Sequence, residues 1–318
     1  MKASWMNTTH IEGVVFDHSL EKKVSGEKSK NPGTAFINGI VNIATDDACN
    51  NVVPVHFSYV TATTSRGAAN STYNVLSRLI DENQCVASVG QENAMRVRID
   101  SAIGLNEWFK DLKDEKPIST MRNEGGFAHI VTDALNADEK ARSTFKVDMV
   151  ITNTRDVEAN PERDLPAKLV VEGYIFDFRK ALLPASFSVI NPDGIKYFQK
   201  LNCSPNTPVV TQVWGRQISQ TIKTKIVSES AFGEDFVRFR EDSNRDFVIT
   251  GTAREPYIWD DENCITATEM KQALQDREIV LATMKKNQEE YQNNRSKKTD
   301  NSTTSSPVAS TIAGGYNF

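Results

Sequence analysis

The sequence predicts a mainly β protein with two small Greek-key barrels in tandem, a C-terminal helix and a flexible tail. Three observations point to this class. Short segments rich in β-branched and aromatic residues fill most of the chain up to Pro256. The phrase IEGVVFD at 11–17 returns as VEGYIFD at 171–177, which suggests one design used twice. From residue 266 the apolar residues recur with the period of a helix.

The first half reads as three strands, a helix and then further strands. Strand patterns occupy 10–24, 34–47 and 51–64. Segment 70–82 has helical spacing behind a cap at Asn70 or Ser71. Extended patterns resume at 93–109, 125–131 and 143–154. This is the element order of an OB-fold, a small barrel that often binds oligonucleotides, although other small barrels share much of it.

The second half begins after the polar turn at 158–166. Strand patterns at 167–181 and 183–191 precede a helical turn at 193–201, so here the helix follows two strands instead of three. A long or paired strand at 207–227 and a last strand at 245–256 complete this half. The predicted divisions are a first OB-like domain at 1–160, a second at 161–258, a helix within 259–292 and a disordered tail at 293–318.

The C-terminal helix has a clear start signal. Thr266 and Glu269 have the spacing of a capping box. An apolar stripe follows it, formed by Met270, Ala273, Leu274, Leu281 and Met284. We expect this helix to dock on a barrel or to pair with another helix. The segment from 293 onwards is rich in Ser, Thr, Asn and Gly, which is typical of a flexible tail.

Composition limits the function. The 37 basic and 42 acidic residues give a net charge of −5, which argues against a protein that coats duplex DNA over its whole surface. A net negative charge remains compatible with nucleic-acid binding by a local cluster of basic residues in a groove. No stretch is apolar enough for a membrane span or a secretory signal, so we expect a cytoplasmic protein. Four cysteines stand singly and are expected to be reduced thiols, at positions Cys49, Cys85, Cys203 and Cys264.

No enzymatic signature is present. The sequence has no phosphate-binding loop, no dinucleotide fingerprint, no H-E-x-x-H and no nucleophile elbow. Its four histidines are dispersed, and the acidic pairs fall in apparent turns where solvated carboxylates are common. We therefore expect no catalytic residue, no metal and no cofactor, although a site assembled from distant residues would not show in the linear sequence.

Basic loops and aromatic strands are the positive signals in the first half. The loop at 20–33 would border the binding face of an OB-fold, although a merely soluble hairpin loop explains it equally well; its cations are Lys22, Lys23, Lys28 and Lys30. Phe57 and Tyr59 share one side of the third strand by parity, and the core is expected to take at least one. Trp108 and its neighbour Phe109 should face opposite sides.

Cations also alternate with apolar residues along the strands. Arg96 and Arg98 share one face of a strand whose other face is apolar, and this basic face could meet DNA or only water. Trp214 and Arg216 share parity in the second half. The remaining candidate nucleic-acid-binding residues are Arg66, Lys223, Lys225, Arg238 and Arg240. Exposed rings would stack bases while the cations neutralise phosphates.

Several phrases carry a family resemblance. SAFGE at 230–234, RDFVITGTAREPY at 245–257 and ALQDREIVLATMKK at 273–286, with IEGVV, FINGIVNIATD and GLNEWF earlier, resemble tandem OB-fold single-stranded DNA-binding proteins of bacteriophages and mobile elements of Gram-positive bacteria. The resemblance implies coating of single strands during replication or recombination. Bacterial single-strand binding proteins typically end in an acidic peptide with a terminal Phe that recruits partners. This chain departs from that pattern, because TIAGGYNF ends in Phe318 but contains no acidic residue.

The sequence therefore favours a non-catalytic single-stranded DNA-binding protein with little sequence preference, in the host cytoplasm if phage-encoded. The tail could recruit replication or recombination proteins, and self-association is left open. The alternative is a phage structural or assembly protein built from self-associating barrels, with the 266–292 helix as the contact. A nuclease would need carboxylates that converge in space. Preference for DNA over RNA is open.

Overall fold

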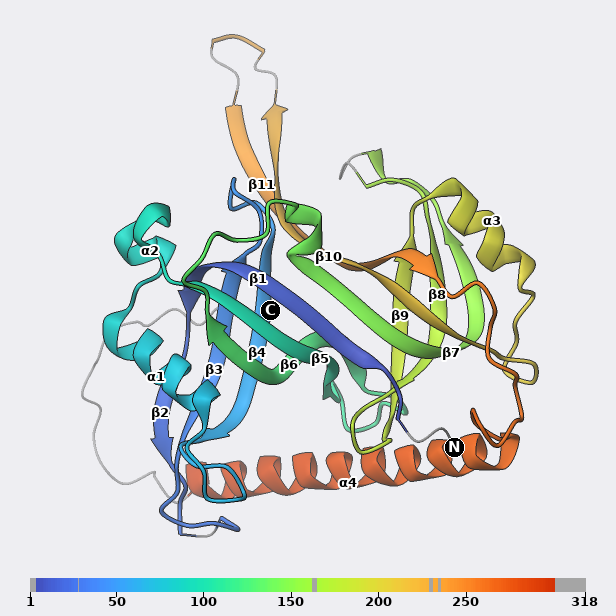
Figure 1. Ribbon diagram of the computed structural model, residues 1–318, viewed down its shortest axis with the longest axis horizontal. Coiled ribbons are helices and arrows are strands. Elements are labelled where there is room, and N and C mark those ends of the chain that lie inside the picture. Colours follow the sequence, from blue (N-terminus) through green and yellow to red (C-terminus); the bar gives the residue numbers. More distant parts are fainter. Residues whose placement is uncertain (1–3, 28, 162–164, 229–230, 234–235, 301–318) are drawn as a thin grey trace.

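The computed structural model describes residues 4–27, 29–161, 165–228, 231–233 and 236–300. Within this part of the chain, eleven strands form one continuous sheet that curls into two barrels (Figure 1). The strands are β1 (Asn7–His18), β2 (Glu21–Val24), β3 (Ala35–Ala44), β4 (Val52–Thr61), β5 (Arg96–Trp108), β6 (Ile118–Ile130), β7 (Ser143–Val157), β8 (Lys168–Phe176), β9 (Leu182–Val189), β10 (Val209–Ser228) and β11 (Phe236–Thr252). The helices are α1 (Ser71–Glu82), α2 (Val86–Val89), α3 (Pro192–Lys200) and α4 (Ala267–Asp300), with short 3-10 turns η1 (Gln91–Asn93) and η2 (Glu139–Ala141).

Five strands close the first barrel. β1 pairs with β3 and β5, β3 pairs with β4, β4 pairs with β6, and β6 returns to β5. All of these pairings are antiparallel except that of β4 with β6. α1 lies between the third and fourth strands of the ring. This is the order of an OB-fold, so the predicted architecture of the first half is confirmed.

The second barrel repeats this plan. β7 pairs with β8 and β10, β8 pairs with β9, β9 contacts β11, and β11 returns to β10. Again the single parallel contact joins the third strand of the ring to the fifth, at Ser188 and Val248. α3 follows β9, which is the third strand. The chain is therefore mainly β, with two OB-like barrels in tandem and a C-terminal helix.

The expectation of a helix after only two strands in the second half is wrong. The segment 143–154, counted with the first half from the sequence, belongs to β7 and opens the second barrel. Alternation in a strand shows which side chains are buried but not which strands lie beside it, so the sequence pattern could not reveal this. The division into domains at 1–160 and 161–258 stays a prediction. β7 hydrogen-bonds to β1 of the first barrel as well as to strands of the second, so the strand pairing by itself does not separate two folding units.

The two copies of the repeated phrase lie on different strands of their barrels. Gly13 is on β1, the first strand of the first barrel, and Gly173 is on β8, the second strand of the second barrel. A Cβ at Gly13 would lie 2.0 Å from the carbonyl oxygen of Ala44 on β3, and one at Gly173 would lie 2.0 Å from that of Val150 on β7. Both glycines therefore permit close approach at the same junction, from opposite sides. The repeated phrase therefore reflects the same need for a glycine where two strands approach closely. It does not place equivalent strands of the two barrels in correspondence.

Gly173→Ala should lower the free energy of unfolding by about 1–3 kcal/mol, because an added methyl group must push β8 away from β7. Gly26→Ala is the control, since nothing lies within 4 Å of a Cβ at that position. A surface change of this kind should stay within about 0.5 kcal/mol. Urea unfolding measures both variants, and a Gly173→Ala protein as stable as wild type would contradict the close-approach explanation.

The two helices that follow the third strands pack into the barrel cores. Asn70 caps α1, as one of the two predicted caps, because its Oδ1 accepts a hydrogen bond from the Thr72 amide at 3.1 Å. Leu76 and Leu79 of α1 are buried in the core of the first barrel. Phe198 of α3 occupies the corresponding core of the second. Each helix thus covers apolar side chains that the strands alone would leave exposed.

α4 begins at the predicted capping box. The Thr266 amide donates to Glu269 Oε2 at 3.0 Å, and the Glu269 amide donates to Thr266 Oγ1 at 3.2 Å. Its first turns bury Met270 and Ala273 in a cluster that also contains Trp5 and side chains of the second barrel. The start of the helix is therefore fixed to the second barrel.

Further along, α4 reaches the hairpin between β5 and β6 of the first barrel. Gln288 Nε2 donates to the Phe109 carbonyl oxygen at 2.7 Å, while Gln288 Oε1 accepts from the Phe109 amide at 3.3 Å. Arg277 forms an ion pair with Glu107 on β5. The helix docks on its own chain and braces both barrels, which is the first of the two predicted arrangements (Figure 1).

α4 continues to Asp300, beyond the predicted limit of 292. The expectation of flexible chain is therefore wrong for 293–300, and the rest of the predicted tail, 301–318, lies outside the described residues. In the described segments no helix is long and apolar enough to cross a membrane. All four cysteines are free thiols, of which Cys85 and Cys264 are buried.

Candidate nucleic-acid interface

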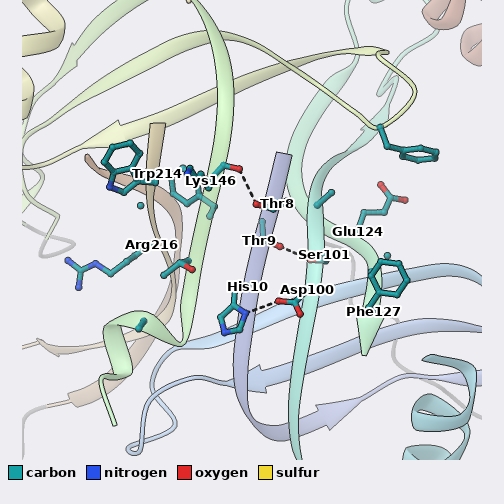
Figure 2. Close-up of a pocket in the computed structure, with 18 of the residues that line it drawn as sticks. Thr8, Thr9, His10, Asp100, Ser101, Glu124, Phe127, Lys146, Trp214 and Arg216 are labelled. Carbon is teal, nitrogen blue, oxygen red and sulfur yellow. Dashed lines mark hydrogen bonds and ion pairs between the residues drawn. The ribbon is translucent and has the colours of Figure 1, made fainter. Parts of the chain in front are cut away.

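A groove of about 1410 Å³ lies where the two barrels join. Residues of β1, β5 and β7 line its middle, and β6 and β10 contribute to opposite sides (Figure 2). β1 and β7 pair over Asn7–Ile11 and Ser143–Val147, so the strands beneath the groove form one uninterrupted layer across both barrels. The groove is therefore an extended surface shared by the two halves of the chain.

The second barrel contributes a ring and two cations from neighbouring strands. In register, Lys146 of β7 pairs with Trp214 of β10, and Thr144 pairs with Arg216. Phe145 is buried between the two outward residues of β7, as alternation requires. Trp214 is 39% exposed and, with Lys146 and Arg216, faces the groove (Figure 2). A tryptophan ring, an ammonium group and a guanidinium group thus gather at one side.

The first barrel contributes Phe127, which is 68% exposed at the opposite side (Figure 2). Gly125 and Gly126 precede it with φ angles of +67° and +112°. A Cβ at Gly126 would lie 2.3 Å from the carbonyl oxygen of Asp100 on β5. Glycine is therefore needed where β6 passes close to β5, directly before the exposed ring.

Two further rings lie on the groove. Tyr59 of β4 is 46% exposed, and Phe178, in the turn after β8, is 87% exposed. The guanidinium carbon of Arg179 is 5.0 Å from the centre of the Phe178 ring. Asp177 Oδ1 accepts hydrogen bonds from the amides of Arg179 and Ala181, both at 2.8 Å, and so shapes the turn that presents the ring.

The carboxylates of the groove are held by other protein groups. Asp100 Oδ1 is 2.7 Å from His10 Nδ1. Glu124 Oε1 accepts from Arg122 Nη2 at 3.0 Å. Asp138 Oδ1 accepts from the backbone amide of Lys140 at 3.0 Å. Their negative charge is partly offset before any ligand arrives.

The cations of the groove are free by comparison. In the described part of the chain, none of them forms an ion pair with a carboxylate; they are Lys140, Lys146, Arg179 and Arg216. Four exposed rings and four cations thus line the same groove, with Arg179 over the Phe178 ring. Such a surface suits a chain of stacked bases linked by phosphates.

The sequence matches the YorF family over residues 6–288. The chain belongs to the YorF family. A search of curated proteins gives no match. Among solved structures, one similar chain is a deletion mutant of the single-stranded DNA binding protein from Thermus aquaticus, with 9% identity, a TM-score of 0.42, and coverage of 80% of this chain and 96% of that chain.

Among the described residues of this YorF-family chain, three of the predicted binding residues line the groove, namely Tyr59, Trp214 and Arg216. Others are exposed elsewhere, on β5 and on the loop after β4: Arg66, Arg96, Arg98 and Trp108. Phe109 is buried while Trp108 is 37% exposed, so these neighbours face opposite sides as expected. The alternation of Arg96 and Arg98 with buried residues is also present, but neither arginine reaches the groove.

Phe57 and Tyr59 do not share a side of β4. Phe57 is 2% exposed in the barrel core and has no face to offer a base. It pairs with Gly39, whereas Val60 pairs with Ile37, so β4 carries one residue more than β3 over this stretch. This bulge reverses the alternation and turns Tyr59 outward. Parity along the sequence could not predict it.

The basic loop after β1 is partly engaged with its own protein. Lys22 Nζ lies 2.7 Å from Asp81 of α1, and Lys23 Nζ lies 2.7 Å from Glu21. Lys30 and Tyr59 both line a small cavity of about 490 Å³. Tyr59 also lines the groove, so this cavity and the groove share a wall. Lys28 lies outside the described residues.

The remaining predicted cations lie on the long β10–β11 hairpin, which projects from the body (Figure 1). Their backbones are paired in register, Lys223 with Glu241, Lys225 with Phe239, Arg240 with Thr224 and Arg238 with Ile226. Their side chains lie outside the described part of the structure, so their role in binding stays a prediction.

Sequence reasoning missed five residues of the groove, namely Phe127, Lys140, Lys146, Phe178 and Arg179. For Lys146 a signal was present, because it alternates with Phe145 and Val147 in the way that Arg96 and Arg98 alternate with their neighbours. The turn residues around Phe178 gave no comparable signal. Among the described residues, no group of three or more His, Cys, Asp or Glu side chains could hold a metal ion.

A second cavity, of about 700 Å³, is lined by β4, β5 and β6 of the first barrel and by β7 to β11 of the second. His56 lies on its wall. Burial lowers the pKa of His56 below its ordinary value of 6.5, and the nearby Arg122 and Arg245 lower it further, while Glu124 opposes them. The neutral imidazole is therefore the favoured form in the folded protein.

This shift predicts a pH dependence of stability. The unfolded chain binds a proton at His56 more readily than the folded chain does. The contribution of the neutral His56 to the free energy of unfolding is therefore fully present above pH 6.5 and is lost as the pH falls below that value. His56→Gln should flatten the curve of unfolding free energy against pH below 6.5. Identical curves for wild type and His56→Gln would show that His56 carries no such linkage.

Proposed function

We propose that this protein binds single-stranded DNA along the groove, with little sequence preference and without catalysing a reaction. The observation that carries the proposal is that, within the described part of the chain, four exposed aromatic rings and four cations without a carboxylate partner line one surface shared by both barrels. Every base has a flat face that can stack on a ring, so such a surface tolerates any sequence. A duplex hides those faces, so the groove should prefer single strands.

The salt dependence of binding tests the electrostatic part. Four phosphate contacts predict that the logarithm of the affinity falls with the logarithm of salt concentration with a slope of about −3, from about −0.7 per contact on a single strand. Lys146→Gln should reduce this slope by about 0.7. Lys286→Gln, on the exposed side of α4, is the matched control and should leave it unchanged. Fluorescence titration with oligothymidylate in a salt series measures both, and an absence of binding at low salt would refute the proposal.

The cellular role is proposed on the family resemblance of the sequence phrases. Coating of single strands would serve replication or recombination of a phage or mobile element, in the host cytoplasm. Recruitment of replication or recombination proteins by the C-terminal tail, and formation of a homo-oligomer, belong to the same proposal. Size-exclusion chromatography separates it from a structural role, because large assemblies that form without DNA would instead support an assembly protein.

A further inference from the structure

The cavity between the barrels has features that the groove does not share. Its volume, about 700 Å³, falls within the range of about 300–1,000 Å³ typical of small-molecule sites. Flat or apolar side chains form part of its wall, from Pro54, Tyr174, Pro184 and Phe247. These surfaces suit a planar ring.

Two buried amides lie side by side in the same wall. Asn123 and Gln217 are 3% and 5% exposed. Asn123 Nδ2 donates to Gln217 Oε1 at 2.7 Å and to the Pro54 carbonyl oxygen at 3.1 Å, which orients both amides. Within the described residues, Asn123 Oδ1 and Gln217 Nε2 have no hydrogen-bond partner. Both atoms are covered in this structure, so contact with a ligand requires a side chain of the cavity wall to move.

The unpaired acceptor belongs to Asn123 and the unpaired donor to Gln217, and the two amides are hydrogen-bonded to each other. A buried polar group without a partner loses its hydration and gains nothing in return, so a ligand that supplies the partner is favoured. The matching edge must carry a donor next to an acceptor. Adenine presents this pair at N6 and N7, and amide side chains are its usual partners.

Positive charge lies on the same cavity. Arg122 and Arg245 both line it. Arg122 Nη2 is paired with Glu124 at 3.0 Å, while its Nε has no hydrogen-bond partner among the described residues. Arg245 is exposed and forms no ion pair within the described residues. The two carboxylates of the cavity wall are engaged, Glu172 with Arg155 and Asp246 with Lys168. The available charge is therefore positive and would attract a phosphate.

We propose that this cavity binds a nucleotide, with adenine preferred, its base against the apolar wall and the Asn123–Gln217 pair and its phosphate near Arg122 and Arg245. The neutral form of His56 leaves a ring nitrogen for a further hydrogen bond. Asn123 and Arg122 line the cavity, whereas Glu124 lines the groove, so the site is distinct from the surface proposed for DNA and does not depend on it. The nucleotide could be free or part of a bound strand.

Titration of the full chain with deoxyadenosine monophosphate tests the site, by calorimetry and by the shift of the melting temperature. We expect it to bind about tenfold more tightly than thymidine monophosphate, the discrimination expected of one bidentate base contact. Arg245→Gln should weaken binding about tenfold through loss of a charge-assisted contact. Arg254→Gln, at an exposed arginine outside both cavities, is the matched control and should change nothing.

Two results would overturn the inference: no binding of the adenine nucleotide by wild type, or binding weakened by Trp214→Ala but not by Arg245→Gln. Prior saturation with oligothymidylate separates the two sources of the nucleotide. Competition supports a nucleotide of the bound strand, and unchanged affinity supports a free one. Oligothymidylate binding that survives while nucleotide binding fails would refute this site alone, whereas the reverse would refute only the proposed function.

Discussion

Trp214→Ala should weaken binding of oligothymidylate about 5- to 150-fold. A base stacked on an aromatic side chain contributes about 1–3 kcal/mol, and each 1.4 kcal/mol is a factor of ten in affinity. Trp214 stands opposite Lys146 in the sheet and beside Arg216, so its ring can hold a base while the cations contact the flanking phosphates. Fluorescence or filter titration at fixed salt measures the change.

The same chain offers a closely matched control. Trp108 is 37% exposed, against 39% for Trp214, and also lies on a long strand, but it lines no part of the groove. Trp108→Ala should therefore change the affinity by less than about twofold. Phe127→Ala, across the groove, should add to the effect of Trp214→Ala because the two rings occupy opposite sides. Equal losses for Trp108→Ala and Trp214→Ala would mean that the groove is not the binding surface.

Arg277→Met should lower the free energy of unfolding by about 3–5 kcal/mol. The ion pair of Arg277 with Glu107 is the buried link between α4 and β5, with side chains only 13% and 6% exposed. Removing the arginine leaves the carboxylate of Glu107 buried without its partner, and this cost exceeds the value of the contact itself. Urea unfolding measures the change.

Two further variants define the origin of this loss. Lys286→Met removes an exposed α4 cation 4.0 Å from Glu290 and should cost less than about 0.5 kcal/mol. The double variant Glu107→Leu with Arg277→Met removes both charges and should recover much of the stability lost in Arg277→Met alone. If Arg277→Met were no more harmful than Lys286→Met, α4 would not depend on this pair for docking.

Local signals in the sequence predicted the elements well where their cause is local. Asn70 and the Thr266–Glu269 capping box mark helix starts because short side chains satisfy amides within the same turn. The alternation around Arg96 and Arg98 revealed an exposed strand face because successive side chains point to opposite sides. The parity of Trp214 and Arg216 identified one side of the groove for the same reason.

The errors share one cause, which is that strand pairing joins residues far apart in the chain. β7 was counted with the wrong half because its partners, β8 and β10, are set by the closure of a barrel and not by its own residues. Tyr59 faces the groove because a bulge against β3 reverses the alternation after Phe57. Neither the choice of partner strands nor a bulge against a partner strand can be predicted from the alternation of residues within one strand.

Composition, alternation and capping thus determine that this chain is mainly β, that each half contains strands and a helix, and that a further helix starts near residue 266. Only the tertiary structure decides that β1 and β7 join, that Phe127 and Trp214 lie on opposite sides of one groove, and that Asn123 meets Gln217 in a second cavity. Local conformational preferences act over a few residues, whereas a binding surface is made by contacts between strands that can lie more than a hundred residues apart, as β1 and β7 do.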